Sequence, residues 1–421
     1  MLSERMRQLG PGLITGAADD DPSGIATYSQ AGAQFGYGLL WTVVFTFPLM
    51  VGIQLVSARL GCLTGRGLAA NIKRVFPRPL LYAVVALLLA ANLINVAADV
   101  AAMGAGLKLL LGGSAHVYSL TFGCLCLLLQ VFLPYRTYVR YLKWLTLALL
   151  SYVAVAFTVQ VPWSQVLGSS LWPGLSLDSG TLTMIVAVLG TTISPYLFFW
   201  QAAEEMEDSR QLVRLDANRQ LEPQSENAVR GHLRRIKWDT CVGMGFSNLI
   251  AFFIILSTAA TLHAAGITDI QTSAQAAEAL RPAGGEFTFL LFSMGIIGTG
   301  LLAVPVLAGS AAYAVAEALD WRNGLDRKLH EAKSFYGIIA LATLGGVALD
   351  FTSADPIREL LWSAMINGVI AVPIMAVMML LGGRRDVLGQ FVIDRKLRRL
   401  GWFATCAMAL AVVAMLVSLW F

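Results

Sequence analysis

Residues 12–24 read GLITGAADDDPSG and place three consecutive carboxylates, Asp19, Asp20 and Asp21, inside an apolar stretch, directly before Pro22. Proline lacks a backbone N–H and clashes with the preceding helical turn, so the sequence predicts a helix that stops and restarts here. A charged side chain in the middle of a membrane span costs roughly 3 kcal/mol or more, and it normally faces a polar cavity. The stretch therefore predicts a broken helix whose gap holds the carboxylates.

The overall composition is that of a membrane protein. Of 421 residues, 57% are hydrophobic and 13% are charged, with a mean hydropathy of +0.67. A typical soluble domain carries about 25% charged residues. The N-terminal segment, MLSERMRQLGPG, runs into the first apolar stretch without a signal-peptidase site, so we expect the first helix to remain in the mature protein.

Several classes of function find no support in the sequence. The net charge of +4 is small, and nucleic-acid binding finds no support. No nucleophile–base set or metal-plus-base motif lies in the apolar segments, so we expect neither an enzyme nor a cofactor. The five cysteines lack CxxC spacing and predict neither a zinc site nor a disulfide framework. The lipid bilayer is the expected surrounding, and no obligatory protein partner is evident. A metal-sensing receptor with little flux stays open as an alternative.

We expect an all-α polytopic membrane protein with eleven transmembrane helices, since about 20 apolar residues span a bilayer. With the N-terminus in the cytoplasm and the C-terminus outside, only Lys108, Arg281 and Arg358 of the 30 basic residues fall on or near the outside, as the positive-inside rule requires. The expected location is a bacterial plasma (inner) membrane. The predicted spans are 11–33, 39–60, 79–111, 116–134, 142–161, 179–207, 238–262, 286–317, 334–352, 359–382 and 401–420.

The sixth predicted span is interrupted in the same manner as the first, at TTISP (191–195). A matched pair of broken helices is typical of inverted-repeat transporters, whose substrate site lies between the two breaks. We therefore predict that residues 1–421 form one transport domain. Helices 1–5 (about 11–161) and 6–10 (about 179–382) form the two repeats, and helix 11 (about 401–420) is an addition. Carboxylate and carbonyl oxygens at the breaks would suit a hard divalent cation.

Three further stretches carry a family resemblance: DPSGIATYSQAGAQFGYGLLW (21–41), SARLGCLTGRGLAANI (57–72) and GTGLLAVPVLAGSAAYA (298–314). Together with the helix-six break, they resemble the Nramp family of divalent-metal transporters. The resemblance implies the LeuT-like fold, with five plus five helices in an inverted repeat and helices 1 and 6 broken. It also implies a metal ion bound between the two breaks.

The resemblance assigns metal-site roles in the first break. Asp21 matches the family's metal-binding aspartate. Gly24 stands where the family has an asparagine, and Asp19 and Asp20 replace a tyrosine and an aliphatic residue. These two extra carboxylates are expected to contact the ion or its bound waters.

In the second break, Thr191 stands where a backbone carbonyl of the family ligates the metal. Ser194 replaces the methionine ligand, and Tyr196 and Gln201 replace two histidines. Loss of the thioether removes the one soft ligand. Loss of the asparagine leaves space for an ion that keeps several waters, as Mg²⁺ does. The pattern resembles a divergent, magnesium-transporting branch of the family.

We therefore expect a secondary transporter that imports Mg²⁺, or next Mn²⁺, by alternating access. Proton coupling is doubtful because Val96 stands at the family's helix-three aspartate, leaving Asp99 as a lone acid that is either a proton acceptor or paired with Asn92 or Asn95. The alternatives are a proton-coupled Mn²⁺/Fe²⁺ symporter and a carrier of an organic or anionic substrate in the same fold.

For two other polar residues, Glu204 and Asn367, both a role in transport and a purely structural role are open. Glu204, like Gln201, lies on the second half of helix six and either lines a path to the cytoplasm or belongs to an acidic helix end near water. Asn367 in helix ten either faces the site or makes an interhelical hydrogen bond.

Overall fold

The computed structural model describes residues 10–133, 145–174, 176, 178–210, 226–325, 327–351 and 356–420. Within these ranges the chain is helical, with turns and connections but no β-strand, which confirms the predicted all-α class. Each of the eleven predicted spans contains a helix. A few residues of these spans lie outside the described ranges, namely 134, 142–144 and 352.

Both predicted breaks are present. The first broken helix consists of α2 (Pro11–Asp19) and α3 (Pro22–Phe35), and the second of α11 (Ser179–Thr192) and α12 (Pro195–Arg210). In each case the second half begins at proline, the residue that fits the first position of a helix because no N–H is needed there. Asp20 and Asp21 form the first connection, and Ile193 and Ser194 form the second.

The other helices follow the predicted order with shifted ends. They are α4 (Leu40–Thr64), α6 (Arg78–Leu111), α7 (Ala115–Phe132), η2 (Leu145–Leu149) with α9 (Leu150–Thr158), α13 (Glu226–Thr258) with η3 (Ala259–His263), α16 (Thr288–Ala318), α17 (Lys333–Asp350), α18 (Pro356–Gly382) and α20 (Arg395–Ser418). Short helices that the sequence did not predict connect them: η1 (Gly36–Leu39), α5 (Leu68–Val75), α10 (Trp163–Leu171), α14 (Ser273–Glu278), α15 (Arg281–Gly284), η4 (Gly285–Phe287), α19 (Arg385–Leu388) and η5 (Gly389–Phe391).

Among the described residues, eight helical stretches are long and apolar enough to cross a membrane. One of them, Pro22–Thr64, joins the second half of the first broken helix to α4. The apolar helix Leu147–Thr158 is shorter, and α17 has 18 residues with charged ends. Length and composition alone therefore support fewer spans than the eleven that the charge pattern predicts.

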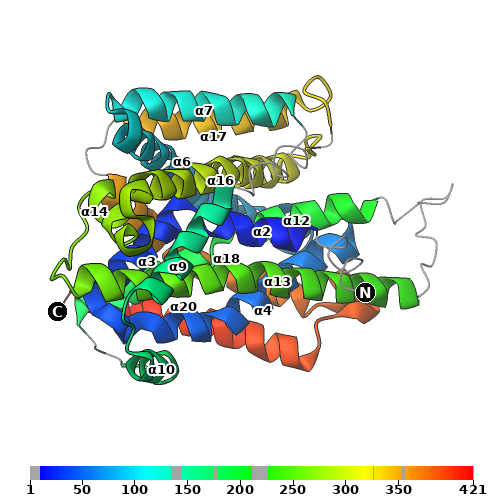
Figure 1. The fold of residues 1–421 in the computed structure, drawn as a ribbon. Helices are drawn as coiled ribbons and strands as arrows, with labels where there is room; N and C mark the ends of the chain where they lie inside the picture. Colours follow the sequence, from blue (N-terminus) through cyan, green and yellow to red (C-terminus); the bar gives the residue numbers. More distant parts are fainter. Residues whose placement is uncertain are drawn as a thin grey trace.

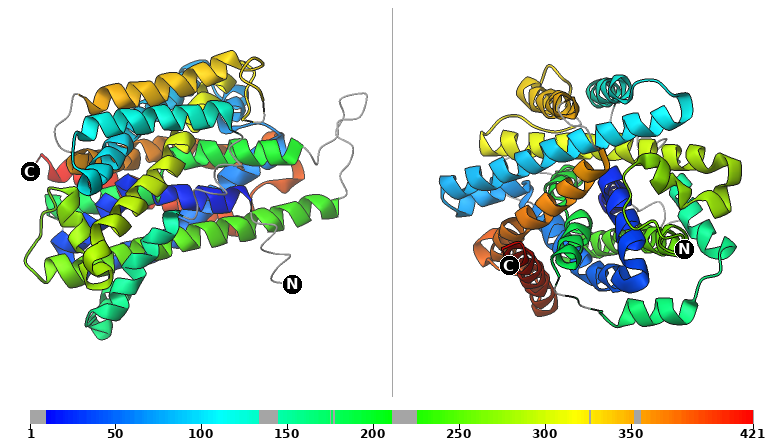
Figure 2. Two further views of the ribbon diagram at one scale, coloured as in Figure 1. Left: turned by 45° about the horizontal axis from the view of Figure 1, so that its top comes forward. Right: turned by 90° about the vertical axis from the view of Figure 1, so that its left-hand side faces the viewer.

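The two broken helices occupy the middle of the bundle (Figure 1). The first packs on α13 and the second packs on α4, so helix 1 meets helix 7 and helix 6 meets helix 2. In a repeat of five helices, helix 6 corresponds to helix 1 and helix 7 corresponds to helix 2. The two contacts are therefore equivalent under the repeat. The paired helices α7 and α17 cover α6 on one side, and α20 lies at the periphery against α4, α11 and α18 (Figures 1 and 2).

Backbone contact fixes α2 on α13. A Cβ atom on Gly12 would lie 2.7 Å from the amide nitrogen of Thr240, and one on Gly16 would overlap the backbone of Gly243. Such small residues allow close helix approach inside a membrane. The Asp239 carboxylate of α13 also accepts hydrogen bonds from the amides of Gly10, Gly12 and Leu13, at 3.0, 2.8 and 3.2 Å. It thereby satisfies amides that the first helical turn leaves unpaired.

We predict that Gly16→Val destabilises the folded protein by about 2 kcal/mol or more, because the added carbons have no space between α2 and α13. The melting temperature of the purified protein in detergent measures the effect. Gly168→Val on α10 is the matched control, since no atom lies within 4 Å of its Cβ position. Equal melting temperatures for Gly16→Val and the wild type would contradict the close packing.

Candidate functional site

The first break is held by the Asp21 carboxylate. Its Oδ1 accepts hydrogen bonds from the Gly24 amide at 2.7 Å and the Ser23 hydroxyl at 2.8 Å, so Asp21 caps the helix that follows it. The positive end of α3 also favours a negative charge at this position. Asp19, Asp20 and Asp21 are 0%, 2% and 1% exposed, so all three carboxyl groups are enclosed by protein.

The phenol of Tyr196 connects the two breaks. Tyr196 follows the proline that starts α12, and its hydroxyl lies 3.1 Å from the Ala18 carbonyl and 3.2 Å from Asp21 Oδ2. The single hydroxyl hydrogen is shared between these two acceptors. Within the second break, the Ser194 hydroxyl faces the carbonyls of Gly190 and Thr191, at 2.8 and 2.9 Å. The structure thus brings together the two segments that the sequence predicted to form one site.

Asp19 and Asp20 both contact α13. The Ser247 hydroxyl lies 2.6 Å from Asp19 Oδ2 and 2.9 Å from Asp20 Oδ1. Sequence reasoning did not identify Ser247, and its only signal was a small polar residue in the apolar run GMGFSNLI. In the described part of the chain, no group of three or more Asp, Glu, His and Cys side chains converges to hold a metal. A cation at the breaks would therefore need hydroxyl or backbone oxygens besides carboxylates.

Several buried oxygen atoms around the breaks lack a hydrogen-bond donor. They are Asp19 Oδ1, Thr191 Oγ1 and both carboxylate oxygens of Asp99. Asp99 lies on α6 beside Asp21 and the backbone amide of Ser23, without an ordinary hydrogen bond to either. Buried acceptors without donors are costly, by about 1–3 kcal/mol each. A bound cation would satisfy these oxygens.

Gly24 lets the two breaks approach each other closely. A Cβ atom on Gly24 would lie 3.2 Å from Thr191 Oγ1 and 3.4 Å from the Asp19 carbonyl oxygen. A larger side chain at this position would require Thr191 or the backbone at Asp19 to shift.

Comparison with known proteins identifies the family. The profile described as "Natural resistance-associated macrophage protein-like" (Nramp) matches residues 12–418. The chain belongs to the Nramp family. It is 27% identical over 409 residues to the divalent metal cation transporter MntH of Pectobacterium carotovorum subsp. carotovorum, covering 94% of this chain and 90% of that protein. The MntH of Klebsiella pneumoniae subsp. pneumoniae is 28% identical, covering 99% and 93%.

Solved structures agree with the Nramp assignment at the level of the fold. A manganese transporter from Eremococcus coleocola, in complex with an aromatic bis-isothiourea compound, has a TM-score of 0.75 at 17% identity, covering 99% of this chain and 87% of that one. Mhp1, a nucleobase-cation-symport-1 family transporter in a closed conformation, has a TM-score of 0.59 at 12% identity, covering 98% and 92%. The predicted LeuT-like architecture is therefore confirmed.

The remaining predicted residues of this Nramp protein lie outside the contacts between the breaks. Asn367 and Asn95 exchange two hydrogen bonds, at 3.1 and 2.9 Å, which matches the interhelical alternative. Asn92 binds the Leu307 carbonyl and Ser310, so the expected pairing of Asp99 with Asn92 or Asn95 is wrong. Both amides are occupied by groups on other helices.

The second half of helix six continues from the breaks as a buried polar helix. Gln201 donates to the Thr240 hydroxyl of α13 at 2.9 Å. Glu204 is buried on the same helix and does not lie at an exposed acidic helix end. Glu205 and Asp208 both pair with Arg235, at 3.2 and 2.8 Å. These contacts bind α12 to α13 on the side of the breaks where α2 begins.

At the start of the second broken helix, Asp178 lies outside the membrane-spanning stretch and caps α11. Hydrogen bonds from the Ser176 hydroxyl, and then from the Thr181 hydroxyl and amide, lower the pKa of Asp178 to about 2. The carboxylate therefore stays ionised at any physiological pH, and the helix start does not depend on pH.

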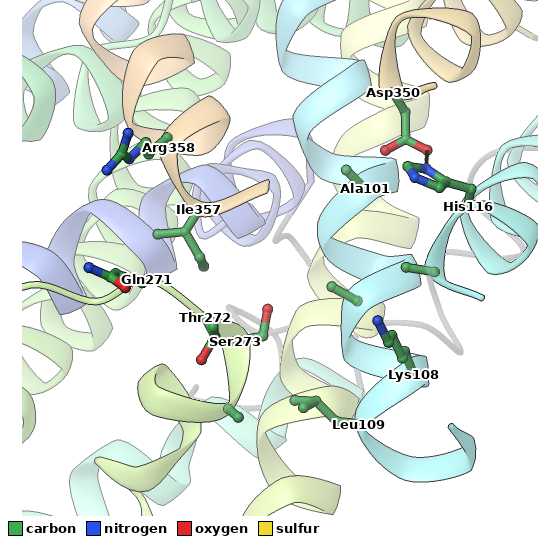
Figure 3. Close-up of a pocket in the computed structure, with 13 residues that line it drawn as sticks. Ala101, Lys108, Leu109, His116, Gln271, Thr272, Ser273, Asp350, Ile357 and Arg358 are labelled. Carbon is green, nitrogen blue, oxygen red and sulfur yellow. Dashed lines mark hydrogen bonds and ion pairs between the residues drawn. The ribbon is translucent and has the colours of Figure 1, made fainter. Parts of the chain in front are cut away.

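A cavity of about 800 Å³ opens at the other end of the bundle, between α6, α7, α14, α17 and α18 (Figure 3). We call it the vestibule. A second, small cavity shares Ser273 and Ile357 with it and reaches Ile25 and Ala26 of α3, about one turn beyond the first break. The vestibule therefore extends toward the first break. The burial of Asp19, Asp20 and Asp21 shows that solvent does not reach the break itself.

We predict that Tyr196→Phe lowers stability by about 1–2 kcal/mol, because the Ala18 carbonyl and Asp21 lose a shared donor in a buried position. The melting temperature in detergent measures this loss. Tyr82→Phe on α6 is the control, since Tyr82 is 49% exposed. If both variants melt at the wild-type temperature, Tyr196 does not hold the two breaks together.

Proposed function

We propose that this Nramp protein is a secondary transporter that carries a hard divalent cation through the space between the two helix breaks. The observation that carries the proposal is the set of buried oxygens without donors at the breaks: Asp19 Oδ1, Thr191 Oγ1 and both oxygens of Asp99. Oxygens of this kind are ligands for hard cations. The MntH relatives, which are named divalent metal cation transporters, support the same substrate class.

Asp21 is the proposed direct ligand. Its Oδ2 has only the long contact of 3.2 Å with Tyr196, whereas Oδ1 is engaged by Ser23 and Gly24. Oδ2 is therefore the oxygen that can turn to a cation while Oδ1 keeps the helix capped. The Thr191 hydroxyl or carbonyl, and the oxygens of Ser194, are the proposed ligands from the second break.

The proposed cargo is Mg²⁺, with Mn²⁺ as the competing candidate. Mg²⁺ keeps several of its waters, and Gly24 supplies no side-chain ligand where the resemblance places an asparagine, so waters would take that place around the ion. Asp19 and Asp20, which both accept from the Ser247 hydroxyl, are the proposed acceptors of hydrogen bonds from such waters. At the position of the family's soft ligand, Ser194 offers a hydroxyl, which removes the preference for a softer metal. Mn²⁺ stays a candidate because the structural neighbour from Eremococcus coleocola is a manganese transporter.

The proposed mechanism is uniport by alternating access, with import driven by the ion gradient and the membrane potential. Moving two charges through 100 mV supplies about 4.6 kcal/mol, which suffices without a coupled proton. The asymmetry of basic residues supports a cytoplasmic N-terminus and an external C-terminus in the inner membrane. In this orientation α6 runs outward, and the vestibule at its C-terminal end faces the outside.

The test is uptake of Mg²⁺, Mn²⁺ and Ca²⁺ into proteoliposomes, with internal pH recorded at the same time. We predict saturable Mg²⁺ uptake without acidification, and loss of uptake in Asp21→Asn because the neutral amide cannot replace the carboxylate. Asp386→Asn is the control, since Asp386 is an exposed residue paired with Arg384 in a connecting segment.

Two outcomes would contradict separate parts of the proposal. Mn²⁺ uptake that Mg²⁺ fails to compete with would exclude the magnesium preference. Acidification that follows metal uptake would exclude uniport and favour a proton-coupled symporter. Full uptake by Asp21→Asn would remove Asp21 from the set of ligands.

A further inference from the structure

The vestibule has an unexpected charge for the entrance to a cation site. Its charged lining residues are Lys108 on α6, Arg358 on α18 and Asp350 on α17 (Figure 3). Among the lining residues that the structure describes, Asp350 is the one carboxylate, and it lies 3.3 Å from the His116 ring. With histidine neutral, the described lining residues carry two positive charges and one negative charge. A fixed positive charge at the wall of a cleft lowers the local concentration of cations beside it.

Lys108 lines the vestibule and lies on the helix that also carries Asp99. It is an exposed residue on the same helix as Asp99, nine residues further along, so the two lie about 14 Å apart along the helix axis. Between them, Ala101 lines the vestibule and Ala102 lines the small cavity that leads to α3. An ion that moves from the vestibule toward the breaks therefore passes Lys108 first and then continues along α6 toward Ala101 and Ala102.

The expected effect is moderate. At about 10 Å in water, one positive charge lowers the local concentration of a divalent cation about fourfold. At about 0.1 M salt the Debye length is also about 10 Å, and the effect falls below twofold. Replacing lysine by glutamate changes the local charge twice as much as replacing it by glutamine.

We propose that Lys108 sets the apparent affinity for the transported cation by repelling it in the vestibule. The inference rests on the proposed function. It makes the protein a transporter suited to an ion supplied at high concentration, since capture is weakened at the entrance while the oxygens of the breaks are unchanged. Lys108 acts on the entry of the ion and does not ligate it, so it alters KM and leaves the maximal rate unchanged.

The test is initial Mg²⁺ and Mn²⁺ influx into cells that lack their own magnesium transporters, which keeps one orientation of the protein. Lys108→Gln and Lys108→Glu are compared with Lys333→Gln and Lys333→Glu. Lys333 is exposed at the opposite end of α17 from Asp350. Influx is measured at low ionic strength and again with N-methylglucamine chloride at about 0.1 M, and rates are normalised to protein in the membrane.

We expect KM at low ionic strength to fall about fourfold in Lys108→Gln and on the order of tenfold in Lys108→Glu. Added salt should largely remove the difference, and the Lys333 variants should match the wild type. Unchanged KM in both Lys108 variants, with normal wild-type uptake, would overturn this inference alone. A higher KM in Lys108→Glu would also overturn it and indicate a bound anion that assists the cation. Absence of any divalent uptake by the wild type would overturn the proposed function as well.

Discussion

The structure depends on the placement of carboxylates where no bulk water can solvate them. Asp19, Asp20 and Asp21 are buried at a gap in a helix, so every one of their oxygens needs a donor or a cation. Other elements provide several of these partners: the start of α3 through Ser23 and Gly24, α12 through Tyr196, and α13 through Ser247. The oxygens that remain without donors define where a positive charge would be stabilised.

The same constraint explains why α13 contacts the first broken helix along its length. Near the middle of α13, Asp239 caps α2, and one turn further Gly243 allows the backbone of α2 to approach. One turn further, Ser247 reaches Asp19 and Asp20. A single face of α13 thus positions α2 and the acidic break together. Any movement of α2 that opens the breaks must either carry α13 with it or separate these contacts.

Local sequence patterns predicted much of this arrangement. Proline and the carboxylates predicted the first break, TTISP predicted the second, and apolar length with charge asymmetry predicted the order of the helices. The partners were not predictable, because Ser247 is 228 residues from Asp19 and Asn367 is 272 residues from Asn95. Such pairs depend on which helix faces meet, and two polar residues in apolar runs carry no sign of their partner. The shared contact of Asp19 and Asp20 with Ser247 likewise follows from the position of α13.

The central claim is that a divalent cation binds between the two breaks. The most direct measurement is anomalous X-ray scattering from crystals of the wild-type protein soaked in Mn²⁺, which serves as a detectable substitute for Mg²⁺. The account predicts one strong anomalous peak within about 4 Å of Asp21 Oδ2, the range of a direct or water-mediated contact. The peak should weaken when Mg²⁺ is added in excess and should be absent in Asp21→Asn. A peak confined to another part of the protein, with none between Asp21 and Thr191, would contradict the claim.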